Sequence, residues 1–211
     1  MKTDKKLGQD VNDYLVSIGK ETPMINSRDL GLSSEQQKIN IHGAFTEIMT
    51  TLGLDLTDSS LVDTPARLSK MYIDELFKGL NYDNFPKCTT VENDMFYNSP
   101  VELDGIVVMT TCEHHFATIE GTARIRYVPD KKIIGLSKFN RIVDFFSRRP
   151  QIQERLTLQI FHALKFILQT EDVSVEIEAV HNCIKTRGVE QHGTTTKTSQ
   201  MSGVFLSEKY F

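Results

Sequence analysis

The stretch IVVMTTCEHHFATIEGTARIRY, residues 106–127, decides the fold. It opens on an apolar run from Ile106 to Thr111, which is typical of a strand. After a polar segment that contains cysteine and histidine, apolar side chains return on one parity of a second strand, which ends at Pro129-Asp130. These side chains are Ile119, Ala123, Ile125 and Tyr127. The sequence therefore predicts two consecutive strands joined by a short segment.

Two helices and two more strands are predicted after this pair. The helices run from about Ser137 to Ser147 and from about Gln151 to Gln169. Alternating apolar residues mark a third strand: Val173, Val175, Ile177 and Ala179. A polar loop rich in glycine and threonine, residues 188–199, then leads to a last short strand near Gly203 to Leu206. The predicted order of this part of the chain is ββααββ.

The first ~90 residues are predicted to be helical. One helix begins near Ser34 and has an apolar face at i, i+3 and i+4 spacing: Ile41, Ala44, Phe45, Ile48, Met49 and Leu52. A second helix begins at Thr64-Pro65, where proline suits the first turn, and stops at Gly79. Residues 81–87 are interpreted as a linker. The sequence thus predicts an α+β protein with a helical region over residues 1–90 and a second domain, which contains the ββααββ unit, over residues 91–211.

Cysteine and histidine gather at the ends of the first and third predicted strands. Cys112-Glu113-His114-His115 closes the first strand, and His181-Asn182-Cys183 closes the third. Zinc binds thiolate and imidazole, and a catalytic zinc takes three protein ligands and leaves one position for water. Cys112, His115 and Cys183 fit that description, so the sequence predicts a catalytic zinc site.

Two further histidines are left beside this predicted site. Strand alternation places His181 on the same face as Cys183, and His114 lies beside Cys112. Histidine gives and takes protons near neutral pH, so both imidazoles are candidates for acid–base work next to a zinc-bound water. This combination favours a hydrolase.

The cysteines also allow roles other than binding a catalytic zinc. A cysteine is commonly a small buried apolar residue, and for Cys112 alone that is the more frequent role. A closed structural zinc site would need a fourth ligand, for which Cys88, in the predicted linker, is the other thiol of the chain. A cysteine nucleophile without metal would not explain why two cysteines come with three histidines.

A second group of candidate residues is basic. Ser137, Lys138 and Arg141 lie at a predicted helix start, where free N–H groups and the helix dipole favour anions. Lys185 and Arg187 follow the third strand on the parity of Cys183. A charged residue on a helix is often only part of a solvated face. Together these residues are candidates for binding a phosphorylated small molecule.

The next predicted helix begins with Gln153-Glu154-Arg155. Glu154 either complements the helix dipole or accepts hydrogen bonds from the edge of a base, and composition leaves both readings open.

Composition excludes several classes of protein. The formal net charge of −4 over 211 residues argues against a dedicated nucleic-acid binder but allows a local basic pocket. Three cysteines suggest no disulfide framework. The polar amino terminus shows no secretory signal, and no stretch approaches the ~20 apolar residues of a membrane span. A cytoplasmic protein without a nucleic-acid or membrane partner is therefore expected.

Five blocks of the sequence resemble the GTP cyclohydrolase I family. They are DTPAR (63–67), CEHHF (112–116), GLSKFNRIV (135–143), RPQIQERLT (149–157) and HNCIKTRGV (181–189). The resemblance implies a tunnelling-type fold, in which an antiparallel sheet carries two helices on one face, behind an N-terminal helical arm. It also implies a homodecameric ring of two stacked pentamers.

The activity that the resemblance implies is a zinc-dependent hydrolysis of GTP. Members of the family open the imidazole ring of GTP, release C8 as formate and form 7,8-dihydroneopterin triphosphate, the first step of folate and pterin biosynthesis. The implied zinc ligands are Cys112, His115 and Cys183. The implied catalytic residues are His114 and His181, which transfer protons around C8 and N7, and Ser137 near the ribose. The implied substrate-binding residues are Glu154 and Gln153 at the guanine edge, and Lys138, Arg141, Arg187 and Arg67 at the triphosphate.

The departures from the family pattern are mild, and two alternatives stay open. Asn182 stands where the family often has a larger apolar or aromatic residue, and residues 190–193 and Gln200 also look individual. One alternative is a related tunnelling-fold enzyme that reduces a nitrile with a nicotinamide cofactor and one reactive cysteine. The other is a non-catalytic binding protein, which could lose His114 and His181. The paired Cys–His ligands argue against the first, and the presence of both histidines argues against the second.

Overall fold

The computed structural model describes residues 2–25 and 31–207. The chain forms two compact units, one of Met1–Thr22 with Gly79–Phe211 and one of Pro23–Lys78. The first unit holds the main sheet, and the first helix and residues 79–90 belong to it. The predicted boundary between a helical region over residues 1–90 and a domain over residues 91–211 stays a prediction.

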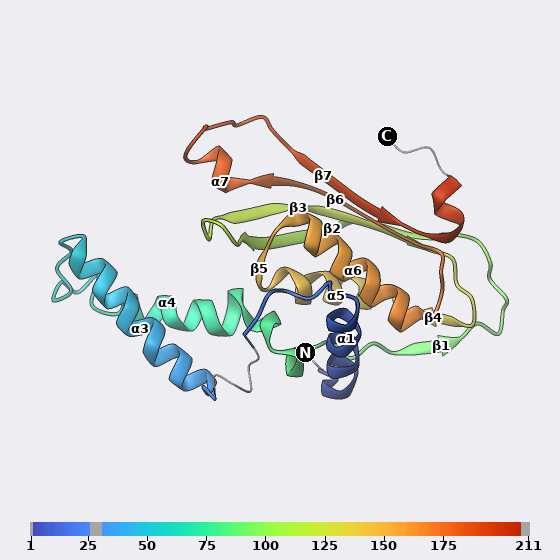
Figure 1. Ribbon diagram of the computed structural model, residues 1–211, viewed down its shortest axis with the longest axis horizontal. Coiled ribbons are helices and arrows are strands. Elements are labelled where there is room, and N and C mark those ends of the chain that lie inside the picture. The colour runs from blue at the N-terminus through green and yellow to red at the C-terminus, as the bar shows by residue number, and fades with distance from the viewer. Residues whose placement is uncertain (1, 26–30, 208–211) are drawn as a thin grey trace. The chain divides into compact units, whose positions relative to one another are not determined.

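Five strands form the main sheet, in the order β5-β2-β3-β6-β7 (Figure 1). Their bounds are β2 Val101–Cys112, β3 Thr118–Tyr127, β5 Pro150–Gln151, β6 Val173–His181 and β7 Thr196–Met201. The four longer strands pair antiparallel. The two-residue β5, which the sequence did not predict, runs parallel to β2. Because the two main helices come between β3 and β6, the α+β order ββααββ is confirmed.

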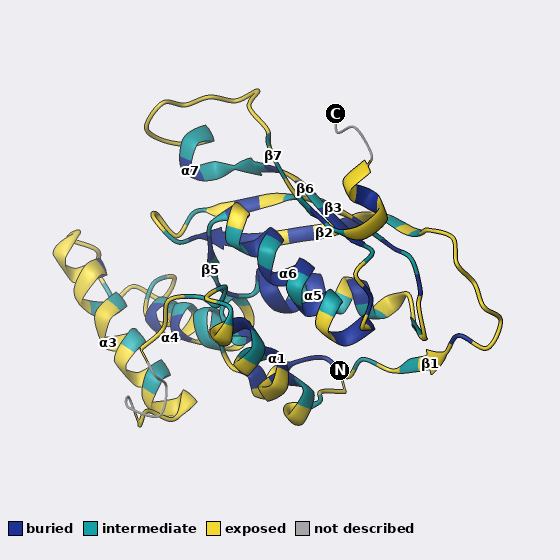
Figure 2. Cartoon of the chain, turned by 45° about the vertical axis from the view of Figure 1, so that its right-hand side comes forward, coloured by how far each residue is buried: buried dark blue, intermediate teal, exposed yellow. Residues whose placement is uncertain are grey.

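Two helices, α5 (Ser137–Ser147) and α6 (Gln153–Leu168), lie on one face of this sheet (Figures 1 and 2). Their apolar sides and alternate residues of β3 and β6 form one core, with the fully or almost fully buried side chains Phe139, Ile142, Leu156, Ile160, Leu164, Ile119, Ile125, Val175 and Ile177. Burying one such side chain contributes roughly 1.5–3 kcal/mol. This layer fixes the strand ends that carry the candidate site.

The helix α1 (Lys5–Ser17) belongs to the same core. The Asp4 carboxylate caps it by accepting a hydrogen bond from the Leu7 N–H at 3.0 Å. Val11 and Leu15, one helical turn apart, are fully buried. The N-terminal segment therefore stabilises the unit that contains the sheet.

Residues 81–87 are not a linker, so that interpretation is wrong. They contain the short 3-10 helix η3 (Tyr82–Asn84), which follows η2 (Lys78–Leu80). The rings of Tyr82 and Phe85 are buried and contact Phe145, at centroid distances of 5.2 and 4.8 Å. The asparagine and proline residues indicated a loop, but the two aromatic side chains between them bury more apolar surface than a linker would. Beyond them, β1 (Thr90–Glu92) pairs antiparallel with β4 (Lys132–Ile134).

The last strand lies earlier than predicted. Thr196–Met201 forms β7 and pairs with β6, whereas Gly203–Ser207 forms the 3-10 helix η4. Gly203 has a φ of +60°, which a strand does not allow, and Val204 N–H donates to the Asp172 carboxylate at 2.8 Å. β7 was missed in the sequence because its residues up to Gln200 are polar on both parities, so it lacks the alternation of apolar and polar residues that marks a half-buried strand.

The second unit consists of α3 (Ser34–Thr51), α4 (Thr64–Lys70) and the π-helix η1 (Met71–Leu76). Both predicted helix starts are confirmed: Ser33 caps α3 through the Gln36 N–H at 3.2 Å, and Pro65 lies in the first turn of α4. A single helix to Gly79 is wrong, because α-helical geometry ends at Lys70. Within the wider π-helical turn, Tyr72 stacks on Phe45 at a centroid distance of 5.4 Å.

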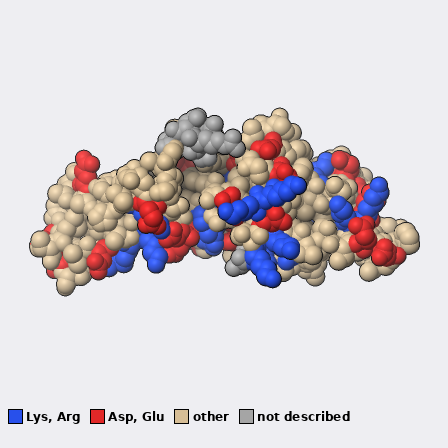
Figure 3. Space-filling model, turned by 90° about the horizontal axis from the view of Figure 1, so that it is seen from below, with Lys and Arg blue, Asp and Glu red and all other residues tan. Residues whose placement is uncertain are grey.

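The surface is mixed in charge. On the face shown in Figure 3, lysine and arginine side chains are interspersed with aspartate and glutamate side chains, in keeping with a net charge of −4. Of the helices described, none is both long enough and apolar enough to cross a membrane.

Candidate metal centre

Cys112, His115 and Cys183 come together at one end of the sheet. Each residue offers one donor atom: the Sγ atom of each cysteine and a ring nitrogen of His115. These three atoms lie within 4.8 Å of one another. Both cysteines are buried and the histidine is exposed. The predicted set of three candidate ligands thus forms one cluster.

A tight turn holds the first two candidate ligands, Cys112 and His115. Cys112 is the last residue of β2; its N–H donates to Ala117 O at 2.7 Å, and its carbonyl accepts from the Phe116 N–H at 2.9 Å. Phe116 has a φ of +52°, a left-handed conformation that closes the turn and costs a non-glycine residue some strain. His115 is carried at the open side of this turn.

Cys183 reaches the cluster by a different route from the one predicted. The strand β6 ends at His181, and Cys183 lies in the one-turn helix α7 (Asn182–Lys185). The Asn182 carbonyl closes that turn by accepting from the Thr186 N–H and hydroxyl, at 3.0 and 2.7 Å. The prediction that His181 and Cys183 share a strand face is therefore wrong, as is the same parity argument for Lys185 and Arg187.

The cluster fits a tetrahedral divalent metal. Zn–S and Zn–N bonds of about 2.3 and 2.0 Å place neighbouring ligand atoms roughly 3.5–3.8 Å apart, so the largest separation between donors needs to shorten by at most about 1 Å. Burial, together with the neighbouring Cys112 thiol, raises the pKa of the Cys183 thiol. A bound cation reverses that preference because it stabilises thiolates. Two buried thiols and one exposed imidazole match three ligands with a solvent-facing fourth position.

Cys88 is not a member of this cluster. Its half-buried thiol donates to Pro86 O at 3.4 Å, and burial raises its pKa to about 12. The positive charges of Lys138 and Arg141 act in the opposite direction, which places both side chains near Cys88. The closed four-ligand zinc site therefore loses its candidate for a fourth ligand.

His114 lies beside the cluster, as predicted, and an ion pair adjoins it. Its Nδ1 is 3.8 Å from Cys112 Sγ, and its Nε2 is 4.0 Å from Glu113 Oε1. Glu113 accepts two hydrogen bonds from the Arg155 guanidinium, at 2.5 and 3.4 Å. The ion pair between Glu113 and Arg155 therefore connects the turn that carries Cys112 and His115 to the first turn of α6. Glu113 and Arg155 lie inside the CEHHF and RPQIQERLT blocks, but the sequence alone predicts no role for either.

His181 contacts the start of α6. Its Nε2 is 2.8 Å from Gln153 Oε1. Burial lowers the pKa of His181, and the nearby Glu154 carboxylate acts in the opposite direction. Gln153 is buried, whereas Glu154 is exposed. The candidate metal cluster, His114, His181 and the exposed carboxylate of Glu154 therefore lie at one end of the sheet.

Comparison with known proteins identifies the family. A family model described as GTP cyclohydrolase I matches residues 41–210. GTP cyclohydrolase 1 of Shewanella loihica is 51% identical over 197 residues, which cover 93% of this chain and 91% of that protein. The chain belongs to the GTP cyclohydrolase I family. GTP cyclohydrolase 1 of Shewanella amazonensis is 50% identical over 199 residues, covering 94% and 91%. The solved apo structure of archaeosine synthase QueF-Like matches 50% of this chain at 17% identity and a TM-score of 0.42.

Membership of the GTP cyclohydrolase I family decides between the alternatives. A relative at 51% identity over 93% of the chain makes this protein an enzyme of that family. The nitrile-reducing and non-catalytic alternatives are therefore set aside. The resemblance inferred from five sequence blocks is confirmed, as is the fold class.

The basic residues that the GTP cyclohydrolase I resemblance points to do not all lie at the metal centre of one chain. Ser137, Lys138 and Arg141 belong to the first turns of α5. There Phe139 packs on Tyr127 at a centroid distance of 5.4 Å, at the far end of β3. The other end of β3, Thr118, pairs with Thr111 beside Cys112. Because β3 has ten residues, it spans about 30 Å between these ends.

Arg187 and Arg67 are the other two basic residues that the resemblance assigns to the triphosphate. Arg187 follows α7 and lies near Cys183, where its positive charge opposes the rise that burial causes in the pKa of the Cys183 thiol. Arg67 lies on α4 in the second unit, where it is exposed and donates to Thr64 Oγ1 at 2.8 Å and to Ser60 O at 3.1 Å. The metal centre of one chain thus has Arg187 beside it, while Lys138 and Arg141 lie toward the opposite end of the sheet.

Proposed function

We propose that this protein opens the imidazole ring of GTP at a zinc ion held by Cys112, His115 and Cys183. The activity itself follows from family membership: GTP is converted to dihydroneopterin triphosphate. The convergence of two thiols and an imidazole within 4.8 Å is the observation that supports the zinc assignment. When bound, zinc supplies a water molecule with its pKa lowered to about 7, a nucleophile for C8 at neutral pH. The proposal is tested by asking whether GTP turnover depends on zinc.

His181 and His114 carry the proton transfers in this proposal. His181 protonates N7 of the purine as C8 is attacked, and its place at the end of β6, next to Cys183, supports that role. His114 lies 3.8 Å from the Cys112 thiol and serves the later transfers, in which formate leaves and the ribose rearranges. An imidazole suits both tasks because it exchanges protons near neutral pH.

Glu154 is proposed to select guanine. Its carboxylate is exposed at the first turn of α6 and close enough to His181 to affect the pKa of that ring. A carboxylate accepts hydrogen bonds from N1–H and from the exocyclic amine of guanine, whereas adenine does not present these donors in this arrangement.

Replacement of Glu154 by alanine is expected to abolish most GTP turnover. Losing the charged partner of a donor pair costs about 1.5–3 kcal/mol or more, so kcat/KM for GTP should fall by at least about tenfold to a hundredfold. Metal content and assembly should be unchanged. Glu171→Ala, at an exposed carboxylate after α6 that pairs with Lys165 at 2.5 Å, is the matched control. Turnover close to that of the unmodified enzyme would show that guanine is read elsewhere.

The complete site is proposed to lie between neighbouring copies of the chain. Ser137, Lys138 and Arg141 would serve as ribose and phosphate ligands, with Arg187 and Arg67, yet β3 separates their helix start from the metal centre by about 30 Å. One nucleoside triphosphate does not bridge that distance. If α5 of one copy approaches the metal centre of the next, both groups can reach the same GTP.

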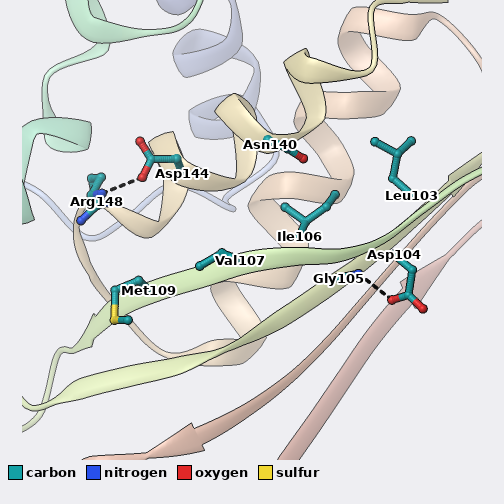
Figure 4. Close-up of a pocket in the computed structure, with 9 residues that line it drawn as sticks. All are labelled: Leu103, Asp104, Gly105, Ile106, Val107, Met109, Asn140, Asp144 and Arg148. Carbon is teal, nitrogen blue, oxygen red and sulfur yellow. Dashed lines mark hydrogen bonds and ion pairs between the residues drawn. The ribbon is translucent and has the colours of Figure 1, made fainter.

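Open strand edges support a ring. β5 pairs with β2 only at Thr111 and Cys112, so within the described residues the outer edge of β2 from 101 to 110 has no partner strand. Along this edge a groove of about 410 Å³ lies between β2 and α5, with Ile106 and Asn140 among its lining residues (Figure 4). Val107 is 69% exposed there. Strand pairing between copies would cover such an edge, and we propose the homodecamer of two stacked pentamers.

Co-expression of two inactive variants tests the shared site. Cys183→Ser damages the metal side and Arg141→Ala the phosphate side, so each alone should have little activity. In rings that contain the two variants in equal amounts, about one site in four combines an intact metal side from one chain with an intact phosphate side from its neighbour. About a quarter of the specific activity should therefore return. Mixing Cys183→Ser with His181→Ala, both on the metal side, should restore none. If co-expression of Cys183→Ser with Arg141→Ala restored no activity, each chain would build its own site.

The compartment is proposed to be the cytoplasm. A centre made of two thiols needs a reducing environment to stay free of disulfides, and the cytoplasm supplies one. Cell fractionation of the untagged protein tests this location. Recovery of the protein from an oxidising compartment would contradict it.

A further inference from the structure

The side chain of Gln153 is buried in a network of hydrogen bonds within the chain. It is 1% exposed. Its Nε2 lies 3.1 Å from Ile177 O, 3.0 Å from Thr196 O and 3.1 Å from Thr198 Oγ1. Its Oε1 lies 2.8 Å from His181 Nε2. An amide nitrogen has two hydrogens, so these three acceptors use its whole donor capacity.

The network also determines which of the two terminal atoms of the Gln153 amide is the nitrogen and which is the oxygen. Two of the atoms around Nε2 are backbone carbonyl oxygens, which only accept hydrogen bonds, so the amide nitrogen must lie on that side. The oxygen therefore faces His181, and an amide oxygen only accepts. His181 must then donate from Nε2, which leaves Nδ1 as its other nitrogen.

Elements on three sides hold this arrangement. Gln153 opens α6, Ile177 and His181 belong to β6, and Thr196 and Thr198 belong to β7. Buried Thr157 adds to the network: its hydroxyl donates to Gln153 O at 2.9 Å and lies 2.7 Å from Thr198 Oγ1. A fully satisfied buried network of this kind is rigid. The ring of His181 is therefore held by a side chain that cannot easily move.

We propose that Gln153 is a positioning residue for His181 and not a contact to guanine. It holds the ring with hydrogen on Nε2, so that Nδ1 is the nitrogen that exchanges a proton with the substrate: the imidazolium gives its Nδ1 proton to N7, and the neutral ring that remains keeps its hydrogen on Nε2. This replaces the guanine-binding role expected for Gln153 from the family resemblance, because its amide donors are used within the chain and its side chain is only 1% exposed. The inference rests on the proposed role of His181. Glu154, the next residue and exposed, keeps the guanine role.

The test is the effect of Gln153→Met on kcat and on KM separately. The variant keeps the length of the side chain and removes the acceptor for His181. For a histidine that binds a metal, losing the partner that orients the ring costs about tenfold to a hundredfold. We expect kcat to fall by that factor, with KM for GTP and zinc content unchanged. A raised KM with unchanged kcat would overturn the inference and restore the guanine contact.

A matched control separates positioning from stability. Gln159 is also a fully buried glutamine of α6, but its amide donates to Lys20 O and Thr22 Oγ1 and has no contact with His181 among its described hydrogen bonds. Gln159→Met should lower the melting temperature without lowering kcat. If Gln153→Met does not assemble, Gln153→Asn, which keeps an amide but withdraws it from His181, should give the same fall in kcat alone.

A double-mutant cycle then distinguishes this inference from the proposed function. In a His181→Ala background, Gln153→Met should cause no further loss of kcat, because its effect passes through His181. A multiplicative loss would overturn the positioning role while leaving the role of His181 intact. An unchanged kcat in His181→Ala alone would remove the proposed proton donor and the inference with it.

Discussion

Replacing Cys183 by serine is expected to release the metal and reduce GTP turnover to background. A serine hydroxyl is a poor zinc ligand at neutral pH, and removal of even an outer partner of a metal ligand costs about tenfold to a hundredfold in affinity. Loss of one of three direct ligands should cost more. Elemental analysis after dialysis should show close to one zinc per chain in the unmodified enzyme and far less in the variant.

Cys88→Ser is the control for Cys183→Ser. Cys88 is a half-buried thiol outside the cluster, so its replacement should leave zinc content unchanged. Full retention of zinc by Cys183→Ser would remove Cys183 from the ligand set. Loss of zinc from Cys88→Ser would bring back a four-ligand site.

Replacing His181 by alanine should separate proton transfer from metal binding. The variant should keep its zinc, its assembly and its affinity for GTP. The chemical step should slow by about two to four powers of ten, the usual contribution of one positioned acid–base group. The loss should appear in kcat, because the interaction is made mainly in the transition state. Single-turnover measurements with saturating GTP would give this rate directly.

Two outcomes would contradict this role of His181, and they differ in meaning. Loss of zinc would make His181 a ligand and reopen the ligand set. Unchanged kcat with intact metal would assign the proton to His114 or to water. His162→Ala serves as the control, because His162 is a partly buried histidine of α6 that packs on Phe161 and Tyr14. Its replacement should leave kcat unchanged.

The sequence predicts the regular elements well where one apolar face is buried. The helix Ser137–Ser147 is found with the predicted bounds, and β3 ends where its apolar alternation ends. Elements that depend on partners elsewhere in the chain are missed. The two-residue β5 exists only because it pairs with the end of β2. The polar β7 is visible only through its ladder with β6.

The candidate site is predicted in its composition more than in its geometry. Cys112, His115 and Cys183 meet as expected, but Cys183 arrives on α7, because a turn closed by Asn182 replaces the expected continuation of the strand. The internal role of Gln153 depends on its contacts with β6 and β7, and no local pattern carries that information. Motif blocks thus name residues without telling which of them face the substrate.

Metal-dependent GTP turnover by the purified protein is the most direct test. The enzyme should be incubated with GTP while formate and the absorbance of the dihydropterin are followed, before and after removal of zinc with a chelator and after its return. Equal amounts of formate and pterin should form, stop when zinc is removed, and resume when about one zinc per chain is restored. Undiminished turnover by protein shown by elemental analysis to be free of metal would contradict a zinc centre at Cys112, His115 and Cys183.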